Sequence, residues 1–380
     1  MIIEQLFIAS LTVGILTAIL NIIGVSVYDL SAAKRLNQLK LHPYTRLFRH
    51  RPLISIVIIS QNNQQFITHC LMTILKSTYR KIEILIIDNA STDESREMIL
   101  KFQLEHPKKS IRLVSRVHTA HNRSIINRNI KRYTSGELIL EMTANQYLHE
   151  NALRNAVNHF NGNPNINLLG LNFRTTAAYS TIGILQKYRE LLEYRTRKCL
   201  NVFRIGLETN TFNGFYRRNP SKTTINNSYY ANDVVIFRSP PKSYYGLAKL
   251  AYLHQLYRLQ TLIPIDFCKH DGSKTKVKTT FGILFVLTTL CMPLIVSYFI
   301  FMAVELREPA YLIFSWVILA AIILFTIWTD EYLKITQRLS FSVLLPLSYL
   351  MFFVLSFLQY VAIAGRLFGK MAGNLVSVKN

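Results

Sequence analysis

The sequence predicts a mainly parallel α/β domain that is flanked by transmembrane helices. Three observations lead to this fold class. Four long segments lack charged residues, basic residues follow the first of them, and short runs rich in β-branched residues alternate with helical patterns between residues 52 and 240. Alternating strand and helix patterns are typical of a parallel sheet covered by helices.

The first apolar segment runs from Leu6 to Tyr28 without a charged residue. A helix of this length, at about 1.5 Å per residue, spans roughly 30 Å of hydrocarbon. The chain opens with Met-Ile-Ile-Glu and lacks the basic start of a signal peptide. We therefore interpret residues 1–28 as a retained N-terminal transmembrane anchor.

Three further uncharged segments follow late in the chain: Phe281–Val304, Ala310–Trp328 and Phe341–Ala364. Core helices of a soluble protein are the alternative, which the length of these runs disfavours. We interpret residues 279–366 as about three transmembrane helices and residues 367–380 as a basic tail.

The basic flanks of the first span predict the topology. Lys and Arg accumulate in residues 29–51, a basic linker, whereas Met1 to Gln5 include none. Because cytoplasmic loops carry this excess, we expect a multi-pass protein of the plasma (inner) membrane with a cytoplasmic central domain. Three C-terminal spans would place Arg366 and Lys370 outside, so a re-entrant or interfacial last segment stays an alternative.

The composition gives a formal net charge of +23. A basic surface suits nucleic acid, but it equally suits anionic lipid headgroups or a nucleotide diphosphate, and the membrane segments favour these. We therefore expect membrane lipids as partners and no nucleic acid. The cysteines form no close-spaced pair, which argues against both a zinc site and a disulfide framework.

The central region, residues 52–240, opens with two strand-like runs. Leu53–Ser60 is apolar and rich in β-branched residues, as in a buried parallel strand, and Ile82–Ile87 repeats this signature. Between them, apolar residues recur at helical spacing from Phe66 to Leu75. The order strand, helix, strand predicts the first unit of a parallel sheet.

The pattern continues with two further strands. Ile111–Val114 predicts the third and Glu137–Met142 the fourth, followed by a helix over residues 151–160. Thr181 to Arg204 predicts a packing helix. No internal repeat or low-complexity tract interrupts this region.

Polar residues follow these strands where an open α/β sheet binds its ligands, beyond the carboxyl ends of the strands. Asn62 follows the first strand, Asp88 the second, and Thr143-Ala-Asn145 the fourth. An acidic residue at such a position commonly accepts hydrogen bonds from a nucleotide. Alternatively, Asp88 and Asp93 only end a strand and cap a helix.

Two of these segments resemble the family 2 glycosyltransferases, in particular the membrane-integrated branch of hyaluronan, chitin, cellulose and poly-N-acetylglucosamine synthases. Pro52–Asn62 is similar to the opening strand of that family, and Tyr79–Asp93 to its second signature. The resemblance covers the chain from Pro52 to Arg258. It implies a GT-A-like nucleotide-sugar transferase domain in which Asp88, with Asn62 and Asp93, binds the nucleotide.

The activity that the resemblance implies is transfer of a sugar from a nucleotide-sugar donor, most often a UDP-sugar. The acceptor is a saccharide or a lipid-linked group in the synthesis of cell-surface polysaccharide or glycolipid. Other subunits of a polysaccharide synthesis complex are further partners that the resemblance implies.

The resemblance also implies Mg²⁺ or Mn²⁺ at an Asp-x-Asp motif, but this sequence has Thr143-Ala-Asn145 at that place. Neutral hydroxyl and amide oxygens supply none of the negative charge that these cations favour. Glu141 is a weak additional candidate, since strand alternation places it on the same face as Thr143.

The acceptor side of the family's site is represented by Gly214 and by Gln255-Leu-Tyr-Arg-Leu259, which resembles a Gln-x-x-Arg-Trp motif. Arg258 is a catalytic candidate because its planar fork suits a diphosphate. Alternatively, residues 241–278 form an amphipathic segment on the membrane surface. Asp233 is a weak candidate for the catalytic base.

Three functions therefore stay open. The first is an active membrane-bound glycosyltransferase. The second, which the altered metal and base motifs favour, is a catalytically inactive homologue that acts as a scaffold or partner subunit. The third is a basic peripheral nucleic-acid-binding protein, which would bind RNA or DNA with strong salt dependence.

Overall fold

The structure is a computed structural model. It divides into two compact units: Met1–Leu30 with Ala177–Glu208 and Pro240–Asn380, and Ser31–Thr176 with Thr209–Ser239. The residues it describes are 22–31, 50–116, 123–176, 180–202, 214–219, 228–241, 243–252, 300–305, 309–329 and 333–347, with separate positions between 5 and 19, at 298 and 307, and between 354 and 365.

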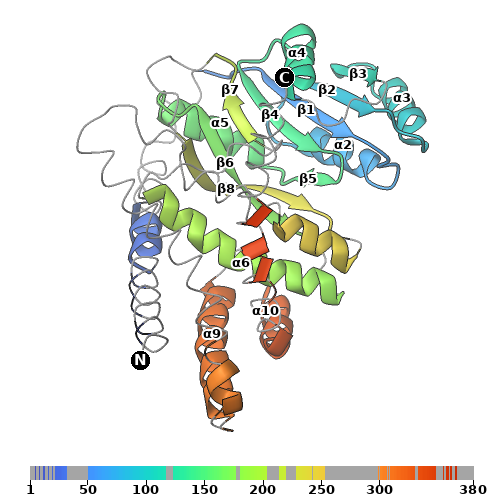
Figure 1. The fold of residues 1–380 in the computed structure, drawn as a ribbon. Coiled ribbons are helices and arrows are strands. Elements are labelled where there is room, and N and C mark those ends of the chain that lie inside the picture. Colours follow the sequence, from blue (N-terminus) through green and yellow to red (C-terminus); the bar gives the residue numbers. More distant parts are fainter. Residues whose placement is uncertain are drawn as a thin grey trace, which may run out of the picture. The chain divides into compact units, whose positions relative to one another are not determined.

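The second unit is built on a mixed sheet with the strand order β3-β2-β1-β4-β7-β6-β8-β5 among the described residues (Figure 1). Its strands are β1 (Ile54–Ser60), β2 (Ile82–Asn89), β3 (Ile111–Arg116), β4 (Leu138–Thr143), β5 (Gln146–Leu148), β6 (Leu168–Thr175), β7 (Gly214–Arg217) and β8 (Ser228–Arg238). Its helices are α2 (Ile67–Lys76), α3 (Ser95–Glu105), α4 (Arg123–Tyr133) and α5 (Ala152–Gly162).

The first half of the sheet is parallel, which confirms the predicted α/β class. Strand β1 pairs with β2 and β4, and β2 pairs with β3, all in parallel. The register places Ser60 opposite Asp88 and Ile59 opposite Thr143. The carboxyl ends of β1, β2 and β4 therefore meet at one edge of the sheet.

The second half of the sheet adds antiparallel pairings. Strand β7 runs antiparallel to both β4 and β6, whereas β6 and β8 are parallel. Strand β5 then pairs with β8, with Gln146 opposite Arg238. Since β5 begins three residues after the end of β4, this pairing brings the end of β8 to the edge where β4 ends.

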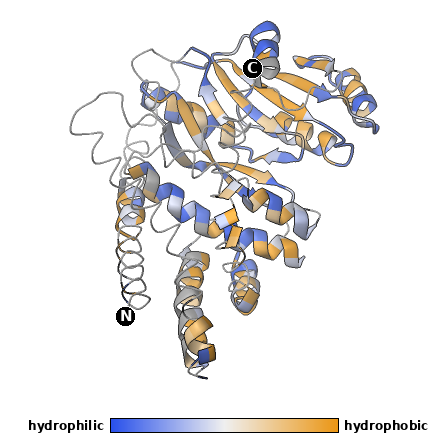
Figure 2. Cartoon of the chain, in the orientation of Figure 1, coloured by the Kyte–Doolittle hydropathy of each residue, from blue (hydrophilic) through white to orange (hydrophobic). Residues whose placement is uncertain are grey.

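Both faces of the central strands are buried, which explains their continuous apolar sequence. Ile54, Ile56 and Ile58 of β1 pack in a large core with residues of α2, α3 and α5. Val57 faces a smaller core on the opposite side, with Ile130 of α4. Figure 2 shows that the central strands are hydrophobic and that the helices around them carry hydrophilic segments.

The amino ends of β1, β2 and β4 are joined through the carboxylate of Glu83. Its Oε1 accepts hydrogen bonds from Ser55 Oγ at 2.7 Å, Ser135 N at 2.6 Å and Gly136 N at 2.8 Å. Burial raises the pKa of Glu83, but these hydrogen bonds outweigh it and the pKa lies below its ordinary value. The ionised carboxylate thus fixes the relative height of the three strands.

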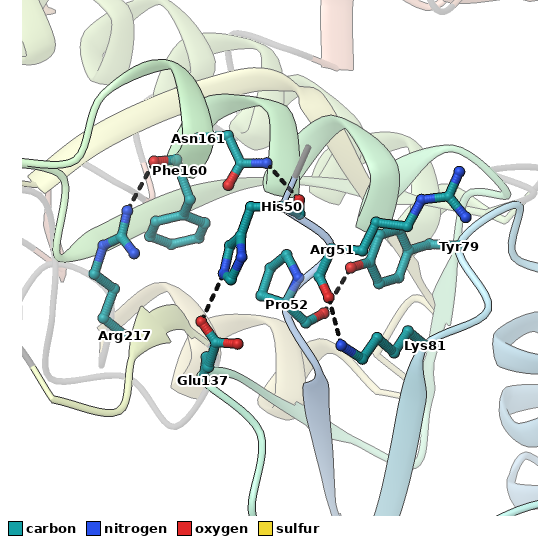
Figure 3. A network of polar contacts seen from close by, with 9 residues as sticks. All are labelled: His50, Arg51, Pro52, Tyr79, Lys81, Glu137, Phe160, Asn161 and Arg217. Carbon is teal, nitrogen blue, oxygen red and sulfur yellow. Dashed lines mark hydrogen bonds and ion pairs between the residues drawn. The ribbon is translucent and has the colours of Figure 1, made fainter. Parts of the chain in front are cut away.

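The segment that leads into β1 is anchored through His50 (Figure 3). The Nε2 atom of His50 lies 2.8 Å from Oε2 of Glu137, and Asn161 donates to the His50 carbonyl at 2.9 Å. Contacts to the residue before β4 and to α5 therefore define where the chain enters the sheet.

The next two residues are held by their carbonyl groups (Figure 3). Lys81 Nζ donates to the carbonyl of Arg51 at 2.8 Å, and the Tyr79 hydroxyl donates to that of Pro52 at 2.6 Å. Burial raises the pKa of Tyr79 to about 12, so its hydroxyl stays a donor at neutral pH.

The first unit is helical in the described residues and includes α6 (Thr181–Val202), α9 (Ala310–Thr329) and α10 (Ile335–Val343). Residues 22–31 form a helix that packs on α6, because a Cβ on Gly24 would lie 2.7 Å from Sγ of Cys199. Nζ of Lys198 lies 2.5 Å from Oδ1 of Asp29 in the same contact. Helix α6 groups with this unit, and the predicted domain bounds 52–240 stay a prediction.

Within the part of the chain that the structure describes, no helix combines the length and apolar character needed to cross a membrane. Helix α9 coincides with the predicted segment Ala310–Trp328. Helix α10 ends at Val343, before a turn at residues 344–345, so the predicted segment Phe341–Ala364 is not one continuous helix. Pro346 accounts for this break, since proline disfavours helical geometry in the residue before it.

Candidate functional site

The site is built on Asp88, at the carboxyl end of β2. Its side chain is 3% exposed. Ser91 donates to Oδ1 of Asp88 from both its hydroxyl at 2.5 Å and its backbone N–H at 3.3 Å. Within the described residues, both bonds go to Oδ1, which leaves Oδ2 to accept from a ligand.

Asn62 ties the loop after β1 to the loop after β2. Its φ of 52° lies in the left-handed region, which asparagine tolerates better than most residues. Its Oδ1 accepts from the backbone N–H of Thr92 at 2.8 Å, and its own N–H donates to Ser91 Oγ at 3.1 Å. Asn62 therefore orients Ser91, which in turn holds Asp88.

Asp93 makes a second connection between these loops. Its Oδ2 accepts from the N–H of Gln64 at 3.0 Å, and its Oδ1 from the N–H of Ser95 at 3.1 Å. Partial burial raises the pKa of Asp93, but the hydrogen bonds from Ser95 and Gln64 outweigh it, so the pKa lies below its ordinary value. Asp93 therefore holds together the loops after β1 and β2, which carry the residues predicted to bind the nucleotide.

Thr143 and Asn145 lie at the same edge, after β4. The Thr143 hydroxyl donates to Oδ1 of Asn145 at 2.5 Å. Among the described residues, no group of three His, Cys, Asp or Glu side chains is placed to hold a metal ion. The donor set at this position is neutral and bonded to itself, so the residues present do not fit the expected Mg²⁺ or Mn²⁺.

Glu141 is buried within β4. Its Oε1 accepts a hydrogen bond from the hydroxyl of Tyr216 on β7, and it pairs with Gly214 across the two strands. Gly214 thus lies beside β4, near the edge that carries Thr143. The contact with Tyr216 gives the carboxylate of Glu141 a structural partner. A role for Glu141 as a metal ligand stays a prediction.

Asp233 lies in the interior of β8, where the register with β6 shifts. Its Oδ1 is 2.6 Å from Nε2 of His159 on α5, and its carbonyl accepts from Asn155 at 2.8 Å. The structure therefore joins Asp233 to a helix and does not place it at the carboxyl ends of the strands. A role for Asp233 as the base stays a prediction that this placement does not favour.

The two arginines that follow Gly214 have structural partners, whereas two predicted residues lie beyond the described part of the chain. Arg217 and Arg218, which follow Gly214 by three and four residues, donate to the carbonyls of Phe160 at 2.7 Å and Gly136 at 2.7 Å. Figure 3 shows the bond from Arg217 to the Phe160 carbonyl, and Arg217 is the last residue of β7. Gln255 and Arg258 lie outside the described residues.

Arg238 belongs to this edge and was not singled out from the sequence. It ends β8, opposite both Gln146 of β5 and Thr175 of β6. The next residue, Ser239, donates its N–H to the carbonyl of Asn145 at 3.3 Å. The sequence pattern that could have identified Arg238 is its position directly after the apolar run Val234–Phe237. Asp88 was identified from the same kind of position.

Residues 55–223 match the family model Glycosyl transferase family 2. The chain is 40% identical over 53 residues to Glycosyltransferase GlyG of Streptococcus pneumoniae serotype 4, covering 14% of this chain and 18% of that protein. It is 36% identical over 56 residues to the uncharacterized glycosyltransferase alr2836 of Nostoc sp. strain PCC 7120, covering 15% of this chain and 17% of that protein.

A solved structure shows the same fold. The mannosyltransferase PcManGT from Pyrobaculum calidifontis, in complex with GDP-Man and Mn²⁺, aligns with a TM-score of 0.56 and 15% identity, over 92% of this chain and 99% of that one. The chain thus carries a nucleotide-sugar transferase fold of the GT-A type. More narrowly, residues 55–223 are similar to the family 2 glycosyltransferases. Its matches span less than a fifth of the two curated relatives.

Proposed function

We propose that this protein is a membrane-bound glycosyltransferase that transfers a sugar from a nucleotide-sugar donor. The acceptor is a saccharide or lipid-linked group in cell-surface polysaccharide or glycolipid synthesis. The observation that carries the proposal is Asp88, which lies at the carboxyl edge of a family 2 domain with Oδ1 held by Ser91. A carboxylate fixed in this way accepts a hydrogen bond from a nucleotide without losing further side-chain freedom.

The donor class follows from the fold and the site together. Asp88 and the two joined loops present polar groups where open α/β sheets bind nucleotides. The family resemblance favours a UDP-sugar, while PcManGT is described with GDP-Man, so both nucleotides belong in a test. Orientation of the donor for attack by an acceptor hydroxyl is the contribution that these loops make to catalysis.

Membrane attachment is the second part of the proposal, and it is supported by the sequence. The uncharged segment Leu6–Tyr28 and the basic residues that follow it favour a multi-pass plasma-membrane protein with the transferase domain in the cytoplasm. Anionic lipids and other subunits of a polysaccharide synthesis complex are the partners that fit this location.

A transfer assay tests the proposal. Full-length protein in detergent is incubated with labelled UDP-sugars and GDP-sugars and a membrane lipid extract, and both transfer and hydrolysis are measured. Asp88→Asn should lower kcat/KM by about tenfold or more, as expected for loss of a charge-assisted hydrogen bond. Glu97→Gln, an exposed carboxylate on α3, is the matched control. Folded protein that neither binds nor turns over any donor would overturn the proposal.

A second candidate is a catalytically inactive homologue that acts as a scaffold or partner subunit. The pairing of Asp233 with His159 favours it, since the candidate base has a structural partner. Cells that carry Asp88→Ala in place of the natural protein distinguish the two. Full production of surface polysaccharide or glycolipid in such cells supports the scaffold, whereas its loss, with normal protein level, supports the enzyme.

A further inference from the structure

We propose that the last apolar segment, Phe341–Ala364, does not cross the membrane but lies along its cytoplasmic surface, with its exposed apolar side chains among the lipid acyl chains. The residues that follow this segment then stay on the same side as the transferase domain. The inference rests on the membrane attachment in the proposed function and is independent of the donor site.

Helix α6 and the helix at residues 244–252 belong to the cytoplasmic side in the proposed topology. No uncharged run of spanning length separates either helix from residues 52–176 in the sequence. Helix α6 also carries charged side chains from Lys187 to Lys198, and such groups are costly inside the hydrocarbon layer. Residues in contact with these two helices therefore lie at the cytoplasmic surface or close to it.

The start of the apolar segment is fixed to α6. The Tyr188 hydroxyl of α6 donates to the carbonyl of Phe341 at 2.6 Å, and the two rings meet edge to face with their centroids 6.1 Å apart. Further on, Leu347 packs on a cluster that joins Leu185 of α6 to the helix at residues 244–252. The first residues of the segment therefore lie at the level of α6.

The end of the segment returns to the same two helices. Leu358 packs on the same cluster as Leu347, and a Cβ on Gly365 would lie 2.7 Å from the hydroxyl oxygen of Tyr252. A spanning helix over Phe341–Ala364, at about 1.5 Å per residue, would hold its ends roughly 36 Å apart on opposite sides of the bilayer. Contacts at both ends with the same helices therefore indicate a segment that returns to the side on which it starts.

Exposed apolar side chains form two stripes in this region, which we call the lipid stripes. The first consists of Ile335, Leu339 and Val343 on α10, and the second of Val354, Phe357 and Val361. A spacing of three or four residues places each group on one face of a helix. Aligned exposed apolar groups of this kind mark a surface that contacts a membrane or a partner.

Basic residues beside the lipid stripes favour lipid as the occupant. Lys334 is exposed at the start of α10 and Arg338 lies within it, while Arg366 and Lys370 follow the segment in the sequence. A helix that combines an apolar face with basic residues lies in the interface of a membrane that contains anionic lipid. A returning segment also leaves Arg366 and Lys370 on the cytoplasmic side, where basic residues accumulate.

Spin labels on the second lipid stripe test the depth of the segment. Val354→Cys, Phe357→Cys and Val361→Cys are labelled one at a time in full-length protein that carries Cys268→Ser and Cys291→Ser, since Cys70 and Cys199 are buried. The protein is reconstituted in vesicles of phosphatidylethanolamine and phosphatidylglycerol, and relaxation by oxygen and by a water-soluble nickel chelate gives the depth of each label.

We expect the three labels to lie about 5–10 Å below the headgroups and within about 3 Å of one another. A crossing helix would instead change the depth by about 10 Å between residues 354 and 361, which would overturn the inference. Labels that are all open to the nickel chelate would also overturn it and would favour a protein partner. Lys101→Cys, exposed on α3, is the control for a label in water.

Labelling from one side of the membrane gives an independent readout. An impermeant maleimide is added to inverted vesicles, and peptide mapping identifies the labelled positions. Ser377→Cys should react to the same extent as Lys101→Cys, whereas Glu305→Cys, in the loop that the proposed topology places outside, should react only after detergent is added. Reaction of Ser377→Cys only after detergent would overturn the inference and leave the proposed function intact. Protection of Lys101→Cys in the same vesicles would overturn the cytoplasmic placement in the proposed function itself.

Discussion

The approach of Gly136 to β1 leads to a quantitative prediction about stability. A Cβ at this position would lie 2.4 Å from Ser55 Oγ, 2.6 Å from Ser55 N and 2.8 Å from the carbonyl oxygen of Leu53. Two of these three atoms belong to the backbone at the start of β1 and cannot rotate away. Gly136→Ala therefore forces β4 and β1 apart at their amino ends.

The cost has two parts. Overpacking of a tight contact costs about 1–3 kcal/mol. The displacement also weakens the bonds from Gly136 N to Ser55 Oγ at 2.9 Å and to Glu83 Oε1 at 2.8 Å, each worth about 1 kcal/mol. We expect a loss of about 3 kcal/mol, which lowers the Tm of a domain of this size by roughly 6–12 °C.

Thermal unfolding of full-length protein in detergent measures this loss, and hydrogen exchange of β1 peptides localises it. Gly162→Ala is the matched control, because no atom lies within 4 Å of its Cβ position at the end of α5. That substitution should be neutral or stabilise by up to about 1 kcal/mol. A Gly136→Ala protein that melts within about 1 °C of the wild type would refute the packing argument.

Three further predictions concern single side chains. The pKa of Glu83 is lowered, so its carboxylate stabilises the fold above the unfolded pKa of about 4.3 and loses this effect as pH falls through the folded pKa. The Tm difference between wild type and Glu83→Gln should therefore be largest at pH 7 and shrink toward pH 3. Burial raises the pKa of both Cys70 and Cys199 to about 12. Iodoacetamide at pH 8 should therefore leave both thiols unlabelled in native protein and label them in guanidinium, as peptide mapping would show. Labelling of the native protein would contradict their burial. Asp233→Asn should lower kcat by less than about threefold if the carboxylate only pairs with His159, whereas a loss of about 100-fold or more would identify it as the base.

The parallel half of the sheet was predictable because its central strands β1, β2 and β4 are buried on both faces. The run Leu53–Ser60 matches β1 within one residue, and Ile82–Ile87 lies inside β2. Helix α6 likewise agrees with the predicted helix from Thr181 to Arg204. In these segments local pattern and tertiary environment agree, so the sequence alone identifies the element.

The antiparallel half was not predictable in the same way. Strand β6 alternates apolar residues with Asn172 and Arg174, both of which are buried, so its pattern is typical of a half-exposed strand. Strand β7 has only four residues, too few for a periodic signal. Their pairing joins segments distant in the sequence, and no local propensity encodes that register.

The same distinction separates the two sides of the candidate site. Asp88 was identified because it follows a recognisable strand, and its own loop supplies the bond from Ser91. Arg238 needed the register of β5 and β8, which depends on contacts between residues about 90 positions apart. Residues brought to a site by such pairings stay hidden until the fold is known.

The contact between Thr143 and Asn145 also has a consequence for folding. Two carboxylates in an Asp-x-Asp motif repel each other and depend on a cation to offset that repulsion. The neutral pair satisfies its own hydrogen bond, so this edge of the sheet is stable without a cation in an enzyme and in an inactive scaffold alike. Geometry at residues 143–145 therefore does not distinguish the two functions. Transfer of a labelled sugar does, because a scaffold that still binds a nucleotide turns over no donor.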